Sequence, residues 1–176
     1  MTTAIYPGSF DPAHNGHLDV IVRAQLIFER IVVAVAQSTR KDGLFPVEER
    51  TAMLRDAVAG LQGVEVQAYA GLTVAFARTV GAKVIVKGLR GVEDLDDERR
   101  QMLMNRHLGG LDTVFLMPAP IHAPLSSTLI REVTRLGGDA TAFVPPPIAQ
   151  RLAAVRQRPE VPPSPRARSG RRRGAR

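Results

Sequence analysis

Two histidines, His14 and His17, lie three residues apart in the segment Gly-Ser-Phe-Asp-Pro-Ala-His-Asn-Gly-His at 8–17. An apolar run at 4–6 precedes this segment, and an apolar pattern of helical period follows it. Residues at this spacing share one face of a helix. A helix N-terminus also offers unpaired N–H groups and the positive end of a dipole, which together favour phosphate. The segment therefore favours nucleotide chemistry, although a histidine pair by itself is as often structural as chemical.

Two further polar clusters are suited to phosphate. The first places three consecutive hydroxyls at 126–128, with Arg131 one helical turn later. One hydroxyl is enough to cap a helix, so three in a row beside an arginine favour a polyphosphate site. The second, at 87–91, carries two cations at the end of an apolar run. Such a strand end is unremarkable alone, but beside the histidine segment it favours contact with phosphate.

Short apolar runs alternate with helical patterns along the chain. The expected strands are residues 4–6, 31–36, 64–69, 83–87 and 113–117. The expected helices are residues 16–28, a helix opening at 46, 73–80, 92–108, a helix from 126 or 127 to 136, and a short helix after 147. This alternation predicts an α/β fold, a single doubly wound Rossmann-like domain with a five-stranded parallel sheet. Such folds bind ligands where the strands end. The three polar clusters should then meet at one edge if the first, fourth and fifth strands are neighbours.

The composition excludes several classes of site. The chain has no cysteine, which rules out disulfides, thiolate catalysis and cysteine-type zinc sites. Its aspartates show no dedicated metal-ligand spacing, and the dinucleotide-binding and Walker A glycine patterns are absent. No apolar run reaches the roughly 20 residues of a membrane span, and the start of the sequence lacks a signal-peptide pattern. We therefore expect a cytoplasmic protein with no membrane partner.

The formal net charge of +7 belongs to one end of the chain. Residues 156–176 contain eight Arg and one Glu, whereas residues 1–155 contain 16 basic and 16 acidic residues. The 156–176 segment is also rich in Pro and has almost no apolar residues to bury, so we predict a disordered tail after a folded domain at 1–155. An alternative function is non-specific nucleic-acid binding by this tail, because arginine-rich disorder binds phosphate backbones.

The histidine pair resembles the HxGH signature of the nucleotidyltransferase superfamily. The cluster at 125–131 resembles its ISSTxxR element, with Leu125 in place of Ile. Other pieces, between about residue 4 and about residue 152, resemble the bacterial phosphopantetheine adenylyltransferase family. They include residues 6–11, 15–17, 45, 48–50, 64–66, 76–78, 88–90, 104–108, 114–118 and 126–127. The HxGH pair is shared across the superfamily, whereas the other pieces, in this order, are specific to the family.

The resemblance implies a reaction in coenzyme A biosynthesis. The phosphate of 4′-phosphopantetheine would attack the α-phosphorus of ATP, giving dephospho-coenzyme A and pyrophosphate. No covalent enzyme intermediate is involved, so catalysis would rest on positioning and charge stabilisation. The resemblance also implies Mg²⁺ bridging the phosphates of ATP, a homohexamer, and feedback by coenzyme A.

The resemblance also assigns roles to individual residues. The expected catalytic residues are His17, which would stabilise the transition state at the α-phosphate, Lys41 and Arg90. The expected ATP-binding residues are Ser9, Phe10, His14, His17, Gly88, Leu89, Arg90, Glu98, His122, Ala123, Pro124, Leu125, Ser126, Ser127 and Thr128. The expected phosphopantetheine-binding residues are Ser9, Lys41, Thr73 and Lys87.

This chain departs from the family pattern at two of these places. Lys87 stands where the best-known members carry arginine, which keeps the charge but loses the bidentate fork. The segment 122–124 also differs, and we expect it to bind ATP through its backbone. From the residues alone, Lys41 would be a solvated loop lysine, and the acidic neighbours of Glu98 at 93–97 would form a solvated helix face.

Other functions within the superfamily stay open. The acceptor could be nicotinamide mononucleotide, or the enzyme could transfer CMP to glycerol phosphate. The pieces at 88–90 and 104–108 argue against both of these reactions. Class I aminoacyl-tRNA synthetases share an HxGH-like element, but they need a KMSKS loop, which this sequence lacks.

Overall fold

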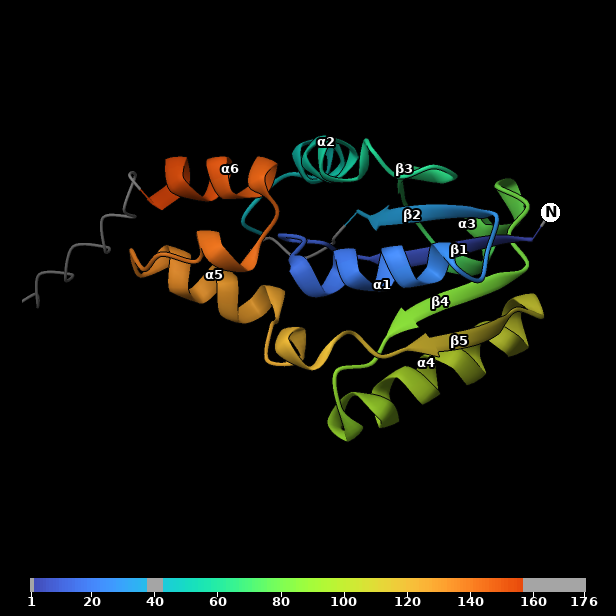
Figure 1. The fold of residues 1–176 in the computed structure, drawn as a ribbon. Coiled ribbons are helices and arrows are strands. Elements are labelled where there is room, and N and C mark those ends of the chain that lie inside the picture. The colour runs from blue at the N-terminus through green and yellow to red at the C-terminus, as the bar shows by residue number, and fades with distance from the viewer. Residues whose placement is uncertain (1, 38–42, 157–176) are drawn as a thin grey trace, which may run out of the picture.

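The chain forms one parallel sheet with helices on both faces (Figure 1). The computed structural model describes residues 2–37 and 43–156. Its strands are β1 Thr3–Gly8, β2 Arg30–Ala36, β3 Val64–Tyr69, β4 Val84–Gly88 and β5 Asp112–Leu116. They lie in the order β3-β2-β1-β4-β5, and every neighbouring pair is parallel. The predicted five-stranded Rossmann-like fold is confirmed.

The helices divide between the two faces of the sheet. They are α1 Asn15–Gln25, α2 Val47–Val58, α3 Thr73–Thr79, α4 Val92–Gly109, α5 Ser127–Arg135 and α6 Pro146–Arg156, with short 3₁₀ helices η1 Pro120–His122 and η2 Thr141–Phe143. In β1, Ala4 and Tyr6 share a buried cluster with residues of α1 and α2, whereas Ile5 shares a second cluster with residues of α3. Successive side chains of a strand point to opposite faces, so β1 serves both cores and is buried on both sides.

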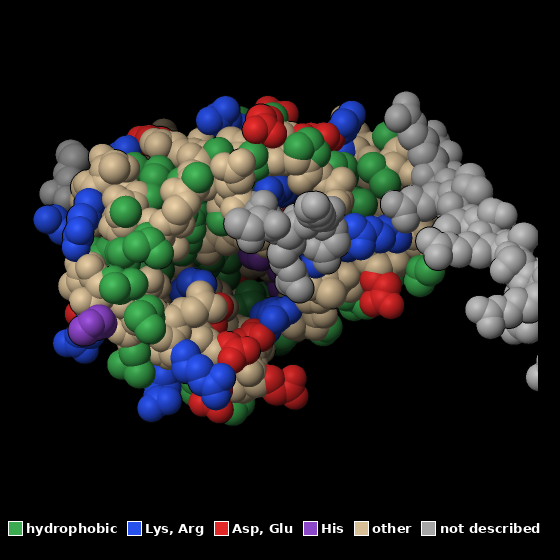
Figure 2. All heavy atoms as spheres, turned by 180° about the vertical axis from the view of Figure 1, so that it is seen from behind, with side chains coloured by type: hydrophobic (Ala, Val, Ile, Leu, Met, Phe, Trp, Pro, Cys, Tyr) green, Lys and Arg blue, Asp and Glu red, His purple; other side chains and the backbone are tan. Residues whose placement is uncertain are grey.

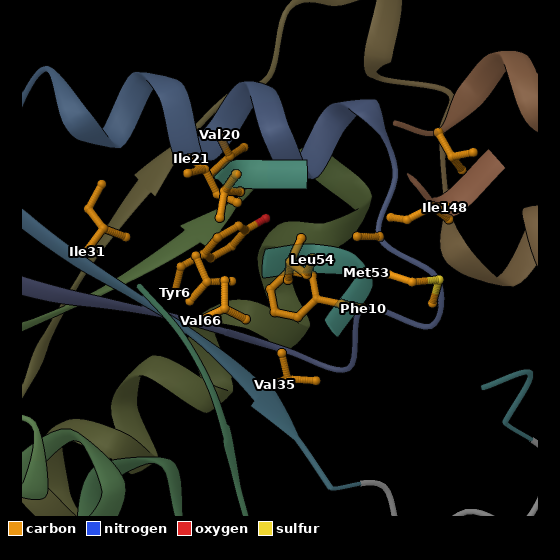
Figure 3. Close-up of a cluster of buried hydrophobic side chains, with 14 of the residues drawn as sticks. Tyr6, Phe10, Val20, Ile21, Ile31, Val35, Met53, Leu54, Val66 and Ile148 are labelled. Carbon is orange, nitrogen blue, oxygen red and sulfur yellow. The ribbon is translucent and has the colours of Figure 1, made fainter. Parts of the chain in front are cut away.

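The larger core anchors the segment that follows β1. Figure 3 shows Tyr6, Phe10 and Leu54 within this core, near Ile21 of α1. The Phe10 side chain is only 2% exposed and packs edge-on against Tyr6, with ring centroids 5.4 Å apart. The segment with the predicted chemistry is therefore fixed to the core by an aromatic side chain.

The ends of β1 and α1 differ from the prediction by two and three residues, for local reasons. β1 continues to Gly8 because Pro7 and Gly8 stay in register with Ala34 and Val35 of β2. α1 ends at Gln25 rather than at residue 28, since the N–H groups of residues 27 and 28 both donate to the Ala24 carbonyl in a closing turn.

The order of the strands creates a switch point beside β1. The chain builds outward from β1 through β2 to β3, and then crosses over to build β4 and β5 on the other side. Connections therefore leave β1 and β4 on opposite faces, which opens a crevice at the C-terminal ends of these strands. β1, β4 and β5 are neighbours, as the convergence of the three polar clusters requires.

The far end of the described chain is helical. α6 includes Arg156, whose Nη1 lies 2.9 Å from Oδ2 of Asp139, so the boundary predicted at 155 falls within this helix. Residues 157–176, the rest of the predicted tail, lie outside the described residues. None of the helices between residues 2 and 156 that the structure describes has the length and apolar character needed to cross a membrane.

Candidate active site

A cavity of about 420 Å³ opens at the switch point, where β1 and β4 end. Figure 2 shows a hollow in this face of the molecule, with histidine side chains inside it and charged side chains around it. Twelve of the residues predicted to bind substrates line the cavity. They are Ser9, Phe10, His14, His17, Lys87, Gly88, Arg90, Glu98, His122, Ser126, Ser127 and Thr128. The three polar clusters therefore meet at one edge of the sheet, as expected.

The two histidines contact each other at the start of α1. Their rings stack with centroids 3.7 Å apart and planes 27° apart. The backbone N–H of His14 donates to Nδ1 of His17 at 3.1 Å. A ring nitrogen that accepts a hydrogen bond carries no proton, so in the neutral imidazole the proton of His17 resides on Nε2. His17 is thus a hydrogen-bond donor through Nε2.

Both histidines are neutral near pH 7. Burial, assisted by the positive charge of Arg90 and by the nearby His122, lowers the pKa of His14 to about 4. Burial, followed by the effects of His14 and Arg90, holds the pKa of His17 well below its usual value. Desolvation disfavours the imidazolium form, and the cations in the same cavity act in the same direction. His17 can therefore stabilise negative charge only as a neutral donor.

Gly16 allows the histidines to pack at the helix start. A Cβ at this position would lie 3.1 Å from Cε1 and Nδ1 of His14 and 3.5 Å from Cβ of His122. His14 itself is buried, and its Nδ1 has no hydrogen-bond partner among the described residues. An unpaired buried nitrogen in a cavity wall is a candidate ligand contact.

Lys87 lines the cavity and lies next to the last residue of β4. Its Nζ lies 3.0 Å from Oε2 of Glu98 and donates to Oε1 of Gln101 at 3.2 Å. Both partners come from α4, so this helix holds the ammonium group in place. A substrate phosphate at Lys87 would lie next to the Glu98 carboxylate and would compete with it for the cation.

Arg90 is held by the carboxylate of Asp94, a residue that the sequence did not mark as part of the site. Its Nε and Nη2 donate to the two oxygens of Asp94 at 2.9 and 2.7 Å, and its Nη1 donates to the carbonyl of Leu125 at 3.2 Å. This bidentate pair lowers the pKa of Asp94. Arg90 precedes α4, so the pair is not a helical one, and the opposite charges of two near neighbours are the signal that could have found it.

The start of α5 supports the segment after β1 as well as lining the cavity. Oγ of Ser126 accepts from the N–H of Leu129 at 3.1 Å, which caps the helix. Oγ of Ser127 donates to the carbonyl of Pro12 at 2.8 Å, and Nη1 of Arg131 donates to the carbonyl of Asp11 at 2.6 Å. Ser127 and Arg131 therefore orient backbone groups of the neighbouring segment, a role that the sequence pattern did not reveal.

Some predicted residues lie outside the described lining of the cavity. They are Leu89, Ala123, Pro124, Leu125 and Thr73. Thr73 begins α3, and its Oγ1 lies 2.9 Å from the Tyr69 hydroxyl. Lys41 lies outside the described residues. The roles assigned to these residues, like those of the twelve that line the cavity, stay predictions.

Two buried charged residues near the cavity, Asp11 and Arg50, were also missed. The Asp11 carboxylate accepts from the N–H groups of Leu44 and Phe45 at 2.8 and 3.0 Å. These partners lie more than 30 positions apart in the sequence, so no local pattern pairs them. Because a charged side chain is seldom fully buried without partners, burial itself was the signal, and it appears only in the fold.

Comparison with known proteins identifies the family. Residues 5–133 match the cytidylyltransferase-like family. The chain is 48% identical over 154 residues to the phosphopantetheine adenylyltransferase of a Nocardioides species, an alignment that spans 88% of this chain and 97% of the relative. It is 47% identical over 152 residues to the phosphopantetheine adenylyltransferase of Thioalkalivibrio sulfidiphilus, spanning 86% and 96% of the two chains. This chain belongs to the phosphopantetheine adenylyltransferase family.

The family predicted from the sequence is thus confirmed. The twelve predicted residues that line the cavity all fall within 5–133, the stretch that matches the cytidylyltransferase-like family. Among solved structures, the chain resembles a bifunctional NMN adenylyltransferase/ADP ribose pyrophosphatase from Francisella tularensis, with a TM-score of 0.69 and 16% identity. That match covers 89% of this chain and 51% of the other, and at this identity it shows the fold alone.

Proposed function

We propose that this chain transfers the adenylyl group of ATP to 4′-phosphopantetheine, giving dephospho-coenzyme A and pyrophosphate. One observation carries the proposal. A single cavity brings together the HxGH pair, the cations Lys87 and Arg90 at the end of β4, and the hydroxyls at the start of α5. The chain that forms this cavity is 48% identical to a protein named for this activity. Phosphoryl chemistry of this kind depends on positioning and charge stabilisation, which these groups can supply.

The reaction needs no nucleophilic side chain. A phosphate oxygen of the acceptor forms a new bond to the α-phosphorus, and the bond from that phosphorus to the pyrophosphate oxygen breaks. Negative charge builds on the α-phosphate oxygens as this happens. The Nε2–H of His17 is fixed by the contact at Nδ1 and donates to this charge without any change in its own protonation.

The remaining groups divide between the two substrates. We assign Arg90 and the capped start of α5 to the phosphates of ATP, because guanidinium, hydroxyls and helix N–H groups together suit a polyphosphate. We assign Lys87 to the phosphate of phosphopantetheine. Lys87 and Arg90 lie three residues apart on the same strand exit, which would bring the two phosphates side by side.

We also propose that Mg²⁺ accompanies ATP. Among residues 2–37 and 43–156, no three His, Asp or Glu side chains are grouped to hold a metal. Two carboxylates of α4, Asp94 and Glu98, are already paired with Arg90 and Lys87. This arrangement favours a cation carried by the phosphates, where it neutralises their charge when bound.

A homohexamer with feedback by coenzyme A and a cytoplasmic location remain proposals. Support for an assembly comes from α4, which has no fully buried residue and exposes the apolar side chains of Leu95, Leu103, Met104 and Leu108. Exposed apolar surface of this kind marks interaction sites. Sedimentation velocity of the full chain should give the mass of six copies, and coenzyme A should slow pyrophosphate release. A monomer at micromolar concentration would contradict the assembly.

The test of the function is a comparison of acceptors. The purified protein is mixed with ATP and Mg²⁺, and pyrophosphate release is measured with 4′-phosphopantetheine, nicotinamide mononucleotide or glycerol phosphate, the last also with CTP. Release only with phosphopantetheine supports the proposal. Release only with another acceptor would keep the superfamily and overturn the assignments of Lys87 and Thr73.

A further inference from the structure

We propose that Arg50 is a positioning residue that orients the Ser9–Phe10 peptide group, so that the N–H of Phe10 points at the phosphates of ATP. The proposal rests on the proposed function for the presence of ATP in the cavity. It concerns a buried cation that does not line the cavity.

Arg50 joins three segments that are distant in the sequence. Only 4% of it is exposed, and its Nε donates to the carbonyl of Phe45 at 3.0 Å. Its Nη1 donates both to the carbonyl of Ala36 at 3.1 Å and to the carbonyl of Ser9. One planar guanidinium therefore holds the end of β2, the segment that leads into α2 and the segment after β1 in a single arrangement.

The contact at Ser9 has a consequence for the next residue. In a planar trans peptide the carbonyl and the following N–H point in opposite directions. Because the Ser9 carbonyl is turned toward Arg50 in the interior, the N–H of Phe10 is turned the other way. Ser9 and Phe10 both line the cavity, so this N–H is directed toward the proposed site of the ATP phosphates.

The conformation of Phe10 shows that this orientation is imposed. Phe10 has a φ of 47°, in the left-handed region that side chains with a Cβ disfavour. Backbone strain of this kind persists only when the surroundings over-determine it, and it gathers at functional sites. Here the ring is buried on one side and the preceding carbonyl is bound by Arg50 on the other.

The next residue is held separately. The carboxylate of Asp11 accepts from Leu44 and Phe45, and its carbonyl accepts from Arg131 at 2.6 Å. These contacts fix the position of the segment, but they bind groups of Asp11, which follows Phe10 in the sequence. Among the described contacts, that of Arg50 with the Ser9 carbonyl is the one that sets the peptide plane of the Phe10 N–H.

The experiment compares Arg50→Lys and Arg50→Gln with Arg55→Lys and Arg55→Gln. Arg55 is a matched control because it lies on the same helix and donates through Nε to the carbonyl of Val66 at 3.1 Å, away from the cavity. A lysine or glutamine at position 50 cannot reach all three carbonyls. We expect the KM for ATP to rise roughly ten-fold, about the effect of one lost hydrogen bond to a charged group. The KM for phosphopantetheine should change much less, and the Arg55 variants should change neither.

A purely structural role would give a different pattern. If the Arg50 variants melt at lower temperature but keep the wild-type KM for ATP, Arg50 only stabilises the fold and the proposal is wrong. Binding of ATP with Mg²⁺, measured by calorimetry, gives the same answer without an acceptor. If the wild-type protein binds ATP but does not use phosphopantetheine, the proposed function fails while the role of Arg50 is still decided.

The amide of Phe10 can also be observed directly in the wild-type protein. Saturation with ATP and Mg²⁺ should shift the Phe10 amide resonance in an NMR spectrum. In the Arg50→Lys protein this resonance should already differ before ATP is added, whereas in Arg55→Lys it should match the wild type. A Phe10 amide that does not respond to ATP in the wild-type protein overturns the proposal, whatever the variants do.

Discussion

His17 receives its tautomer from a backbone contact and its neutral state from burial. The His14 N–H occupies Nδ1, burial keeps the ring neutral, and the proton remains on Nε2. We predict that His17→Ala lowers kcat by about 10³-fold, the scale of one transition-state donor, with only a small change in either KM. Steady-state kinetics with both substrates would show this, with His107→Ala on the exposed end of α4 as the control. Equal losses in turnover and in substrate binding would argue against a transition-state role.

His14 links stability to pH. Its pKa is about 4 in the folded protein and near 6.5 in an unfolded chain, so the unfolded chain binds the proton more readily. The free energy of unfolding is therefore highest above pH 6.5 and falls as the pH drops toward 4, by up to about 3 kcal/mol from this residue. Urea unfolding between pH 7.5 and 4.5 measures the slope, which His14→Gln should reduce. The pKa of His17 is also lowered in the folded protein, so His17 adds to the slope and part of it should remain in the His14→Gln protein. Identical slopes in the two proteins would contradict the assignment.

Lys87 offers a phosphate a single ammonium group, whereas an arginine at this position would offer two parallel N–H donors. Held by Glu98 and Gln101, it can still present its charge to a phosphate at the end of β4. We predict that Lys87→Ala raises the KM for phosphopantetheine more than the KM for ATP. An unchanged KM for phosphopantetheine would remove Lys87 from the substrate site, and Lys83→Ala, at an exposed position just before β4, serves as the control.

At the scale of elements, the start of α5 caps its own helix and lines the cavity, and we propose that it also binds ATP. Oγ of Ser126 accepts from the N–H of Leu129, so Ser126→Ala should cost about 1 kcal/mol of stability and raise the KM for ATP. Thr79→Ala is a matched control, because that exposed hydroxyl donates to the carbonyl of Phe76 within α3, outside the cavity. Thermal unfolding and ATP kinetics of both variants check the prediction. A loss of stability with ATP kinetics unchanged would limit Ser126 to capping.

For the whole molecule, the excess of positive charge lies beyond α6. Residues 157–176 hold seven Arg and one Glu, whereas α6 ends with Arg156 paired to Asp139. We predict that removing residues 157–176, while keeping Arg156, leaves pyrophosphate release unchanged and abolishes any salt-sensitive binding to RNA. Pyrophosphate assays and RNA binding at two salt concentrations test both halves. A large loss of activity would show that the segment contributes to the enzyme.

The sequence by itself determined the elements and their class. Hydrophobic periodicity is a local property, so all five strands, and the helix between each pair of them, could be predicted to within a few residues. The same holds for residues whose chemistry depends on close neighbours. The spacing of His14 and His17 and the hydroxyls before Arg131 were visible as patterns, and the order of the elements placed them at the strand ends.

Only the tertiary structure decided which partners these residues have. The contacts of Arg50 with Ser9, of Asp11 with Leu44, and of Arg131 with the Asp11 carbonyl join positions that lie 33 to 120 residues apart. Such pairings depend on how β1, α2 and α5 pack together, and no local spacing encodes that packing. Burial also lowers the histidine pKa values, and the packing of the folded chain holds Phe10 at a positive φ. Solvent exclusion and backbone constraint arise only when the whole chain is folded, so the chemistry of the site follows from the fold.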